Sequence, residues 1–211
     1  GGAEPLTSKL AIIGPSSHPD ADVDYTFGQV AINEAHVDYS GNCGNISSGV
    51  GPFAIDEGLV KAVEPITKVR IYNTNTKKIL VAEVPVKDGK AKVKGDYKIA
   101  GVPGTGAKEM MDFAGTAGAV TGKMLPTGNT IDPKEIDGLG KIEVSIVDVA
   151  NPVVFVRASD LGLTGIETPA EIDSNEKMLK ILESIRAKAA VMIGMAETEE
   201  EATKKTPAFP M

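Results

Sequence analysis

The chain has 211 residues, of which 42% are hydrophobic and 24% are charged, and its formal net charge is −7. This length suits one large or two small domains, and the acidic balance argues against a general binder of nucleic acid or of anionic membranes. The single cysteine excludes an intramolecular disulfide and favours a cytoplasmic location, and one cysteine with two histidines makes no metal-ligand pattern. No apolar run reaches the roughly 20 residues that a membrane-spanning helix needs.

The first hundred residues are predicted to be mainly β-strand. Apolar and polar residues alternate in short runs, which predicts strands at residues 6–13, 22–32, 68–73, 78–83, 84–87 and 90–94. The alternation slips at Gly28, which predicts a β-bulge there. Asp88-Gly89 is a strong signal for a two-residue hairpin turn.

One helix is predicted within this strand-rich part, at residues 46–60. Apolar residues such as Ile46, Val50 and Leu59 fall near helical spacing. Gly51 and Pro52 oppose a helix, by roughly 1 kcal/mol for a glycine and 3 kcal/mol for an interior proline. The helix is therefore expected to depend on packing, with its glycines allowing close contact.

The second half begins with a glycine-rich break. Residues 101–112 interrupt the strand pattern, so we expect a first domain at 1–100 and a second at 101–211. Strands are predicted at 142–148 and 152–157, and a helix begins at 173–176 with Leu179, Leu182 and Ile185 on its apolar face. A short helix is predicted to open at Thr198 and Glu201. Residues 101–106 and 118–123 do not match dinucleotide or phosphate loops, so no cofactor is predicted.

Two residues are candidates for chemistry. Cys43 lies in a turn of small and amide residues directly before the predicted helix, where free N–H groups suit a bound carboxylate and favour a thiolate. Gly44 would let a ligand approach the backbone closely. From the residues alone, Cys43 can equally be a buried structural thiol. Lys9 interrupts an apolar strand, and such a lysine is usually a solvent-exposed residue.

Seven motifs, in order along the chain, resemble those of a known protein family. They are Gly-Gly-Ala-Glu-Pro-Leu-Thr-Ser-Lys at residues 1–9, Asp22-Val-Asp-Tyr, Gly41-Asn-Cys-Gly-Asn, Gly49-Val-Gly-Pro-Phe-Ala, Val102-Pro-Gly-Thr-Gly, Leu125-Pro-Thr-Gly-Asn and Asp148-Val-Ala-Asn-Pro-Val-Val-Phe. Together they resemble the PrpF family of methylaconitate and methylitaconate isomerases, within the diaminopimelate-epimerase-like superfamily. The resemblance runs from the first residue to the last.

The resemblance implies an α+β fold. Two similar domains each wrap a mixed sheet around a central helix, with the active site in the cleft between them. Family members are nearly twice this length, so the chain is expected to be a fragment that lacks an N-terminal strand and the C-terminal part of the second domain.

The resemblance also implies a function. Family members are cofactor-independent isomerases that move a proton on small unsaturated di- or tricarboxylates. One type converts 3-methylitaconate to 2,3-dimethylmaleate, a second isomerises 2-methylaconitate, and a third tautomerises 4-oxalomesaconate. Lys9 and Cys43 would be the catalytic proton-transfer pair, and no metal is expected. The groups expected to hold the substrate carboxylates are Ser8, Asn42, Gly44 and Asn45.

Two other classes remain open at this point. A non-catalytic, accessory carboxylate-binding protein is one alternative. A racemase or epimerase is the other, and it would be expected to pair Cys43 with a second cysteine, which the chain does not contain. The oligomeric state is not determined by the sequence, and a homo-oligomer is among the alternatives.

Overall fold

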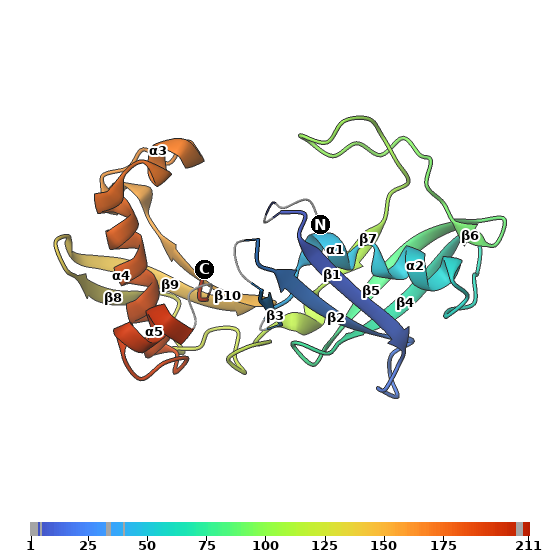
Figure 1. The fold of residues 1–211 in the computed structure, drawn as a ribbon, viewed down its shortest axis with the longest axis horizontal. Helices are drawn as coiled ribbons and strands as arrows, with labels where there is room; N and C mark the ends of the chain where they lie inside the picture. Colours follow the sequence, from blue (N-terminus) through green and yellow to red (C-terminus); the bar gives the residue numbers. More distant parts are fainter. Residues whose placement is uncertain (1–3, 5, 33–34, 40, 206–208) are drawn as a thin grey trace. The chain divides into compact units, whose positions relative to one another are not determined.

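A computed structural model describes residues 4, 6–32, 35–39, 41–205 and 209–211. The chain divides into two compact units, Gly1–Thr116 and Ala117–Met211, and each combines a sheet with helices, so the α+β class is confirmed (Figure 1). The boundary lies later than the one predicted at 100/101. The reason is that strand β7 (Met110–Asp112) still pairs with strand β5 (Lys78–Lys87) of the first unit.

Unit 1 is built on a seven-stranded mixed sheet. Its order is β1 (Lys9–Pro15), β2 (Val23–Val30), β4 (Ile66–Asn73), β5 and β6 (Lys90–Ala91), while β3 (Val37–Asp38) pairs with β2. Strands β2 and β4 run parallel, and the pairs β1–β2 and β4–β5 are antiparallel. Asp88 and Gly89 both have positive φ (56° and 75°), which confirms the predicted hairpin turn between β5 and β6.

The bulge predicted at Gly28 is wrong. The register between β1 and β2 runs without interruption through Leu10 opposite Gly28. A Cβ at Gly28 would lie 2.9 Å from Val37 Cγ1 and 3.1 Å from Tyr39 Cε1. Glycine is needed here for a close side-chain approach across the sheet, which gives the same sequence signal as a bulge.

The helix predicted at 46–60 forms two short helices, α1 (Gly44–Ser47) and α2 (Val50–Asp56). Pro52 lies in the first turn of α2, where a missing N–H removes no helical hydrogen bond. A Cβ at Gly51 would lie 2.7 Å from Val84 Cγ2 and 2.9 Å from Ala82 Cβ. The absence of a side chain at Gly51 therefore lets α2 pack directly on β5, as the glycine pattern predicted.

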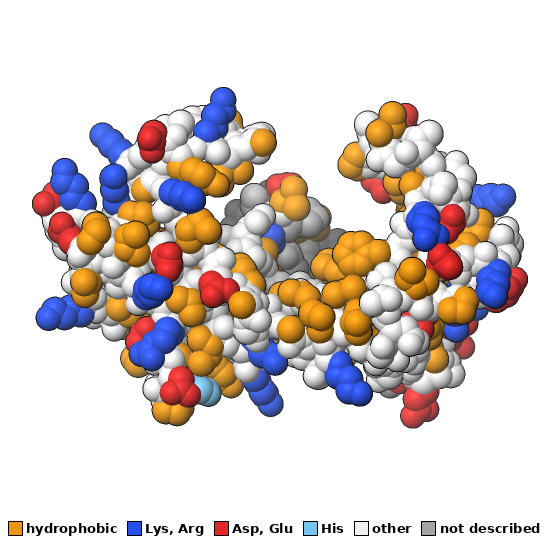
Figure 2. Space-filling view, turned by 180° about the vertical axis from the view of Figure 1, so that it is seen from behind, with side chains coloured by type: hydrophobic (Ala, Val, Ile, Leu, Met, Phe, Trp, Pro, Cys, Tyr) orange, Lys and Arg blue, Asp and Glu red, His pale blue; other side chains and the backbone are white. Residues whose placement is uncertain are grey.

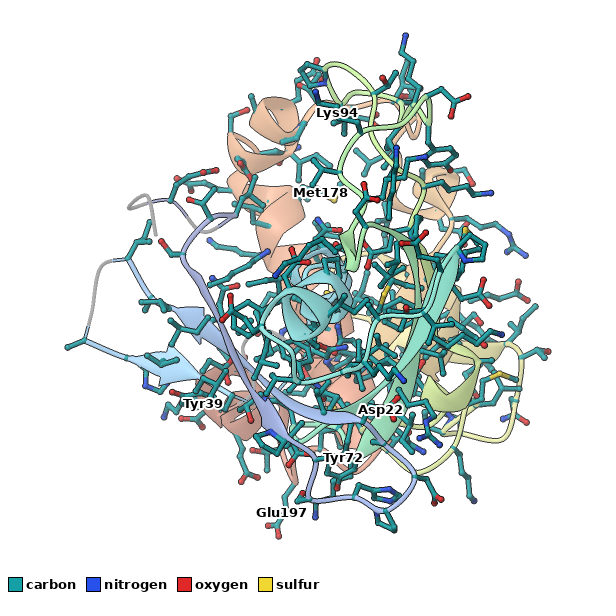
Figure 3. The ribbon with its side chains drawn as sticks, turned by 90° about the vertical axis from the view of Figure 1, so that its right-hand side faces the viewer. Asp22, Tyr39, Tyr72, Lys94, Met178 and Glu197 are labelled. Carbon is teal, nitrogen blue, oxygen red and sulfur yellow. The ribbon has the colours of Figure 1, made fainter. Side chains whose placement is uncertain are left out.

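The start of β2 is fastened to β4 at one end of this sheet. Arg70 donates from Nη2 to Asp22 Oδ1 at 2.8 Å and from Nε to Oδ2 at 3.3 Å. This hydrogen-bonded guanidinium holds the pKa of Asp22 below its usual value. Tyr72 lies near Asp22 in Figure 3 and stacks on His18, with 4.9 Å between the ring centroids.

A carboxyl group borders the core of unit 1. Glu109 directly precedes β7, and its Oε1 is buried without a hydrogen-bond partner among the described residues. The same oxygen lies 3.6 Å from the position of a Cβ on Gly51, so the carboxyl packs against α2. Burial raises the pKa of Glu109 from 4.5 to about 7.

Unit 2 is a three-stranded antiparallel sheet with one long helix across it (Figure 1). The strands are β10 (Asn151–Val156), β9 (Gly140–Val149) and β8 (Asp132–Ile136), and the helix is α4 (Glu176–Met192). The shorter elements of the chain are the 3₁₀ helices η1 (Ala114–Thr116) and η2 (Ala158–Leu161) and the helices α3 (Pro169–Asp173) and α5 (Glu199–Lys205).

Helix α4 starts where the sequence predicts, because the Asn175 side chain accepts a hydrogen bond from Met178 N at 3.0 Å. Ile185 is buried as predicted, but in the first turns of the helix the buried positions are displaced by one residue. Met178 and Ile181 are buried, whereas Leu179 is 40% exposed. The apolar stripe of α4 is wider than the part that the three strands cover, so the sequence pattern alone does not fix which residues face the sheet.

The last described residues lie along the edge of β10. Met211 N donates to Pro152 O at 2.9 Å, and Met211 O accepts from Val154 N at 2.7 Å. Bonds to the two residues that flank Val153 are the pattern of a parallel strand pair. Arg186 Nη1 donates to the Phe209 carbonyl at 3.0 Å and so holds this segment.

A buried carboxylate closes the loop at the start of unit 2. Asp148 on β9 is fully buried, and its Oδ2 accepts from Val120 N, Thr121 N and Thr121 Oγ1 at 2.6 to 2.9 Å. The glycine-rich stretch 118–123 is therefore folded around a carboxylate of the chain itself.

Charged side chains of both signs are interspersed over the face of the molecule drawn in Figure 2, with apolar side chains between them. Among the helices of the described ranges, none has the length and apolar character needed to cross a membrane.

Asp148→Ala is expected to destabilise the protein by about 2–4 kcal/mol, because three donors of the 118–123 loop lose their buried acceptor. Urea denaturation followed by circular dichroism measures this. The control is Asp137→Ala. The Asp137 side chain is 89% exposed, so this substitution should change the free energy of unfolding by less than about 0.5 kcal/mol. Equal stability of the two variants would contradict the role of Asp148.

Glu109→Gln is expected to remove a pH dependence of stability. The folded-state pKa is raised from 4.5 to about 7, so the stabilising contribution is complete below pH 4.5 and is lost as the pH rises through 7. At pH 8 the glutamine variant should be more stable by on the order of 1 kcal/mol, a value reduced for the partial exposure of the group. Thermal melts of both proteins from pH 5 to 8 check this, and parallel curves would contradict it.

Candidate active site

Cys43 stands at the start of α1, as predicted, although the helix begins at Gly44 rather than near Ile46. Cys43 is the N-cap residue, with extended backbone angles of φ −126° and ψ 113°. Its carbonyl accepts from Ser47 N at 3.1 Å and from Ser47 Oγ at 2.7 Å. Because α1 has only four residues, its dipole is too short to anchor an anion by itself.

The Cys43 thiol meets the side chain of Lys9. Lys9 Nζ lies 3.4 Å from Cys43 Sγ, and both residues are partly buried. Lys9 is the first residue of β1 and shares a face of that strand with Ile13, whose partner on β2 is the fully buried Tyr25. The interpretation of Lys9 as a residue of the solvent-exposed face is therefore wrong.

This contact brings two proton carriers together. An ammonium and a sulfur at hydrogen-bond distance can hold one proton between them, as ammonium and thiolate or as amine and thiol. Either form leaves one group that can accept a proton and one that can donate it. The arrangement suits general acid–base chemistry on a carbon placed beside both atoms.

The four residues expected to hold carboxylates fall into two pairs. Gly44 and Asn45 are exposed beside Cys43, so they are accessible to a ligand. Ser8 and Asn42 are only 5% and 7% exposed. The Asn42 Oδ1 accepts from Ser47 Oγ at 3.3 Å and from Asn73 Nδ2 at 3.4 Å, which gives this amide a part in the scaffold of the turn.

Two residues that the sequence pattern did not indicate, Asn73 and Asn75, hold this turn from the other side. Asn73 ends β4, is fully buried, and contacts Asn42. Asn75, in the loop between β4 and β5, donates to the carbonyl of Tyr39 at 2.8 Å. The signal in the sequence was a run of amide and hydroxyl residues, 73–76, which is longer than a tight hairpin turn needs.

A buried phenol completes the surroundings of Cys43. Tyr25 is fully buried on β2, and burial raises its pKa to about 12. A negative charge on Cys43 raises that pKa further, whereas the Ser47 hydroxyl acts in the opposite direction. Tyr25 is therefore a neutral phenol wherever the Cys43–Lys9 pair functions.

An apolar groove of about 440 Å³ lies in unit 2, between α4 and β10. Its polar members Glu183 and Arg186 bind each other at 2.6 and 2.7 Å. Because these charges are already paired, the groove offers no free acid–base pair and is not the candidate active site. In the part of the chain that the structure describes, no three His, Cys, Asp or Glu side chains group closely enough to hold a metal ion.

The family model named PrpF protein matches residues 1–211. This chain belongs to the PrpF protein family. It is 68% identical over 210 residues to the 3-methylitaconate isomerase of Eubacterium barkeri and 45% identical over 205 residues to the 4-oxalomesaconate tautomerase of Pseudomonas putida. The alignments cover 100% and 97% of this chain, and 55% of each relative.

The fold agrees with the family. The crystal structure of a methylitaconate-delta-isomerase superposes with a TM-score of 0.85 at 68% identity, over 100% of this chain and 54% of that one. The chain therefore spans about half the length of the proteins that it matches. The predicted resemblance to the PrpF family is confirmed.

Lys9→Met is expected to slow the alkylation of Cys43 by iodoacetamide about tenfold at pH 7, because the thiolate loses its adjacent cation. Mass spectrometry of the modified protein gives the rate. Lys61→Met is the matched control, since Lys61 is exposed, and it should leave the rate unchanged. Equal rates in both variants would mean that Lys9 does not act on the sulfur.

Proposed function

We propose that the whole protein is a cofactor-independent isomerase of small unsaturated dicarboxylates, of the 3-methylitaconate to 2,3-dimethylmaleate type, with Lys9 and Cys43 as its proton-transfer pair. The observation that carries the proposal is the 3.4 Å contact between Lys9 Nζ and Cys43 Sγ. It occurs in a chain that is 68% identical to the 3-methylitaconate isomerase of Eubacterium barkeri.

The proposed reaction moves one proton along a three-carbon unit. A base takes the proton from the carbon next to a carboxylate, and the electron pair left behind spreads over the double bond and that carboxylate. The other group of the pair, as the acid, then delivers a proton to the far methylene carbon, which becomes a methyl group. One proton leaves and one enters, so the overall charge is unchanged and no redox partner is needed. Stabilising the enediolate requires hydrogen-bond donors at the carboxylate.

The spacing of the pair favours this shift over racemisation. A racemase that uses two bases places them on opposite faces of one carbon, each within about 3–3.5 Å of it, so the bases lie roughly 6–7 Å apart. Lys9 Nζ and Cys43 Sγ are in direct contact at 3.4 Å. A carbon does not fit between them, but both can face two carbons of one allylic unit from the same side.

Gly44 and Asn45 are the proposed carboxylate-binding groups, because they are exposed directly after Cys43. Ser8 and Asn42 are proposed to support the site from beneath, since both are buried. The substrate of this chain is a small carboxylate, and the single cysteine supports a cytoplasmic location.

Two relatives define the alternatives within the family. One is the 2-methyl-aconitate isomerase of Shewanella oneidensis, 38% identical over 212 residues, and the other is the Pseudomonas putida tautomerase. Absorbance assays of the whole protein with 3-methylitaconate, 2-methylaconitate and 4-oxalomesaconate decide among them. Tight binding of these acids without turnover of any would favour the accessory carboxylate-binding protein instead.

Cys43→Ser and Lys9→Ala are each expected to lower kcat of the whole protein by about 10²–10⁴-fold, because each removes one proton carrier. The variants should keep a thermal midpoint close to that of the unsubstituted protein, since neither residue is fully buried. Steady-state kinetics and thermal melts are measured on the same samples.

The matched control is Lys61→Ala, which removes an exposed lysine and should leave kcat unchanged. A kcat within about tenfold of the unsubstituted protein, or roughly 1.4 kcal/mol in the barrier, would remove that residue from the assignment.

A further inference from the structure

We infer that the loop between β4 and β5, residues 73–77, positions the Cys43 turn, and that Asn73 is its central positioning residue. The inference rests on the proposed function only for its effect on turnover. The expected effect of the loop on the position and reactivity of Cys43 is argued from the contacts of the loop alone.

Both the oxygen and the nitrogen of the Asn73 side-chain amide form hydrogen bonds that fix the turn. Its Oδ1 accepts from Thr76 N at 2.9 Å and from Thr76 Oγ1 at 2.8 Å, which fixes the orientation of the side chain. Its Nδ2 then points toward Asn42 Oδ1 at 3.4 Å and Asn75 Oδ1 at 3.2 Å. Because Asn73 is fully buried, water cannot replace these bonds.

Asn75 and Thr74 anchor the loop itself on β2. Asn75 Oδ1 accepts from Phe27 N at 2.8 Å, and Asn75 Nδ2 donates to Phe27 O at 2.9 Å, so one side chain bonds β2 as a neighbouring strand would. Thr74 N donates to Tyr25 O at 2.9 Å. The loop is therefore fixed to the strand that pairs with β1, on which Lys9 lies.

The segment that leads to Cys43 is held by the same loop at two points. Asn75 Nδ2 donates to Tyr39 O at 2.8 Å, and Asn73 Nδ2 donates to Asn42 Oδ1. These points are four residues and one residue before Cys43 in the sequence. The backbone on the N-terminal side of the thiol is thus set by amides of β4 and its loop, while β2 sets the position of Lys9. The contact between sulfur and nitrogen depends on both.

Asn73→Asp tests the inference. Aspartate has the same shape as asparagine and keeps the acceptor for Thr76. It replaces the Nδ2 donor toward Asn42 by a charged oxygen, which repels the Asn42 Oδ1 oxygen. In the whole protein, we expect alkylation of Cys43 by iodoacetamide to slow about tenfold at pH 7, and the pH midpoint of that reaction to rise by about one unit. We also expect kcat for 3-methylitaconate to fall about tenfold with less than threefold change in KM.

Two further variants separate positioning from general loss of stability. Val86→Ala weakens the buried core on β5 and should leave the pH profile of alkylation unchanged. Thr76→Val removes one of the two bonds that orient Asn73 and should shift the profile in the same direction as Asn73→Asp by a smaller amount. This milder variant supplies the test if Asn73→Asp does not fold.

An alkylation profile of Asn73→Asp and Thr76→Val that matches Val86→Ala would overturn the inference. That result leaves the proposed isomerase intact, provided that Cys43→Ser abolishes turnover. Conversely, a shifted profile in a protein that isomerises none of the three acids would support the positioning role and count against the proposed function.

Discussion

The contact between Lys9 Nζ and Cys43 Sγ depends on two backbone segments that are far apart in sequence. Lys9 is placed by the antiparallel pairing of β1 with β2. Cys43 is placed by a turn with little regular structure, since the helix that follows it has only four residues. Holding one hydrogen bond across this gap requires the turn to be fixed as firmly as the strand.

Fixed side-chain amides meet that requirement. Buried amides with both ends bonded impose one geometry, because any rotation leaves a donor or an acceptor without a partner. Asn73 and Asn75 supply such bonds to the turn. Elsewhere in unit 1, Gly51 lets α2 pack closely on β5. Unit 1 thus combines a close-packed apolar core with a small polar layer at the site.

The spacing of the pair also bears on the kind of reaction. In the proposed reaction the two groups in contact would act on one side of a substrate, which suits the movement of a proton along an allylic unit and not inversion at one carbon. The chain spans about half the length of its relatives, and the shared fold with a TM-score of 0.85 relates it to a methylitaconate-delta-isomerase. The Lys9–Cys43 contact lies within unit 1.

The sequence by itself determined the α+β class, the family, most strands, the hairpin turn at Asp88-Gly89 and the start of α4, because each depends on local pattern or on motif identity. Only the tertiary structure decided which residues at the start of α4 are buried, why Gly28 is glycine, and how close Lys9 Nζ lies to Cys43 Sγ. It also revealed the Asn73–Asn42 contact. These features depend on which distant segments meet, and a pattern of period two or of helical spacing describes one segment at a time.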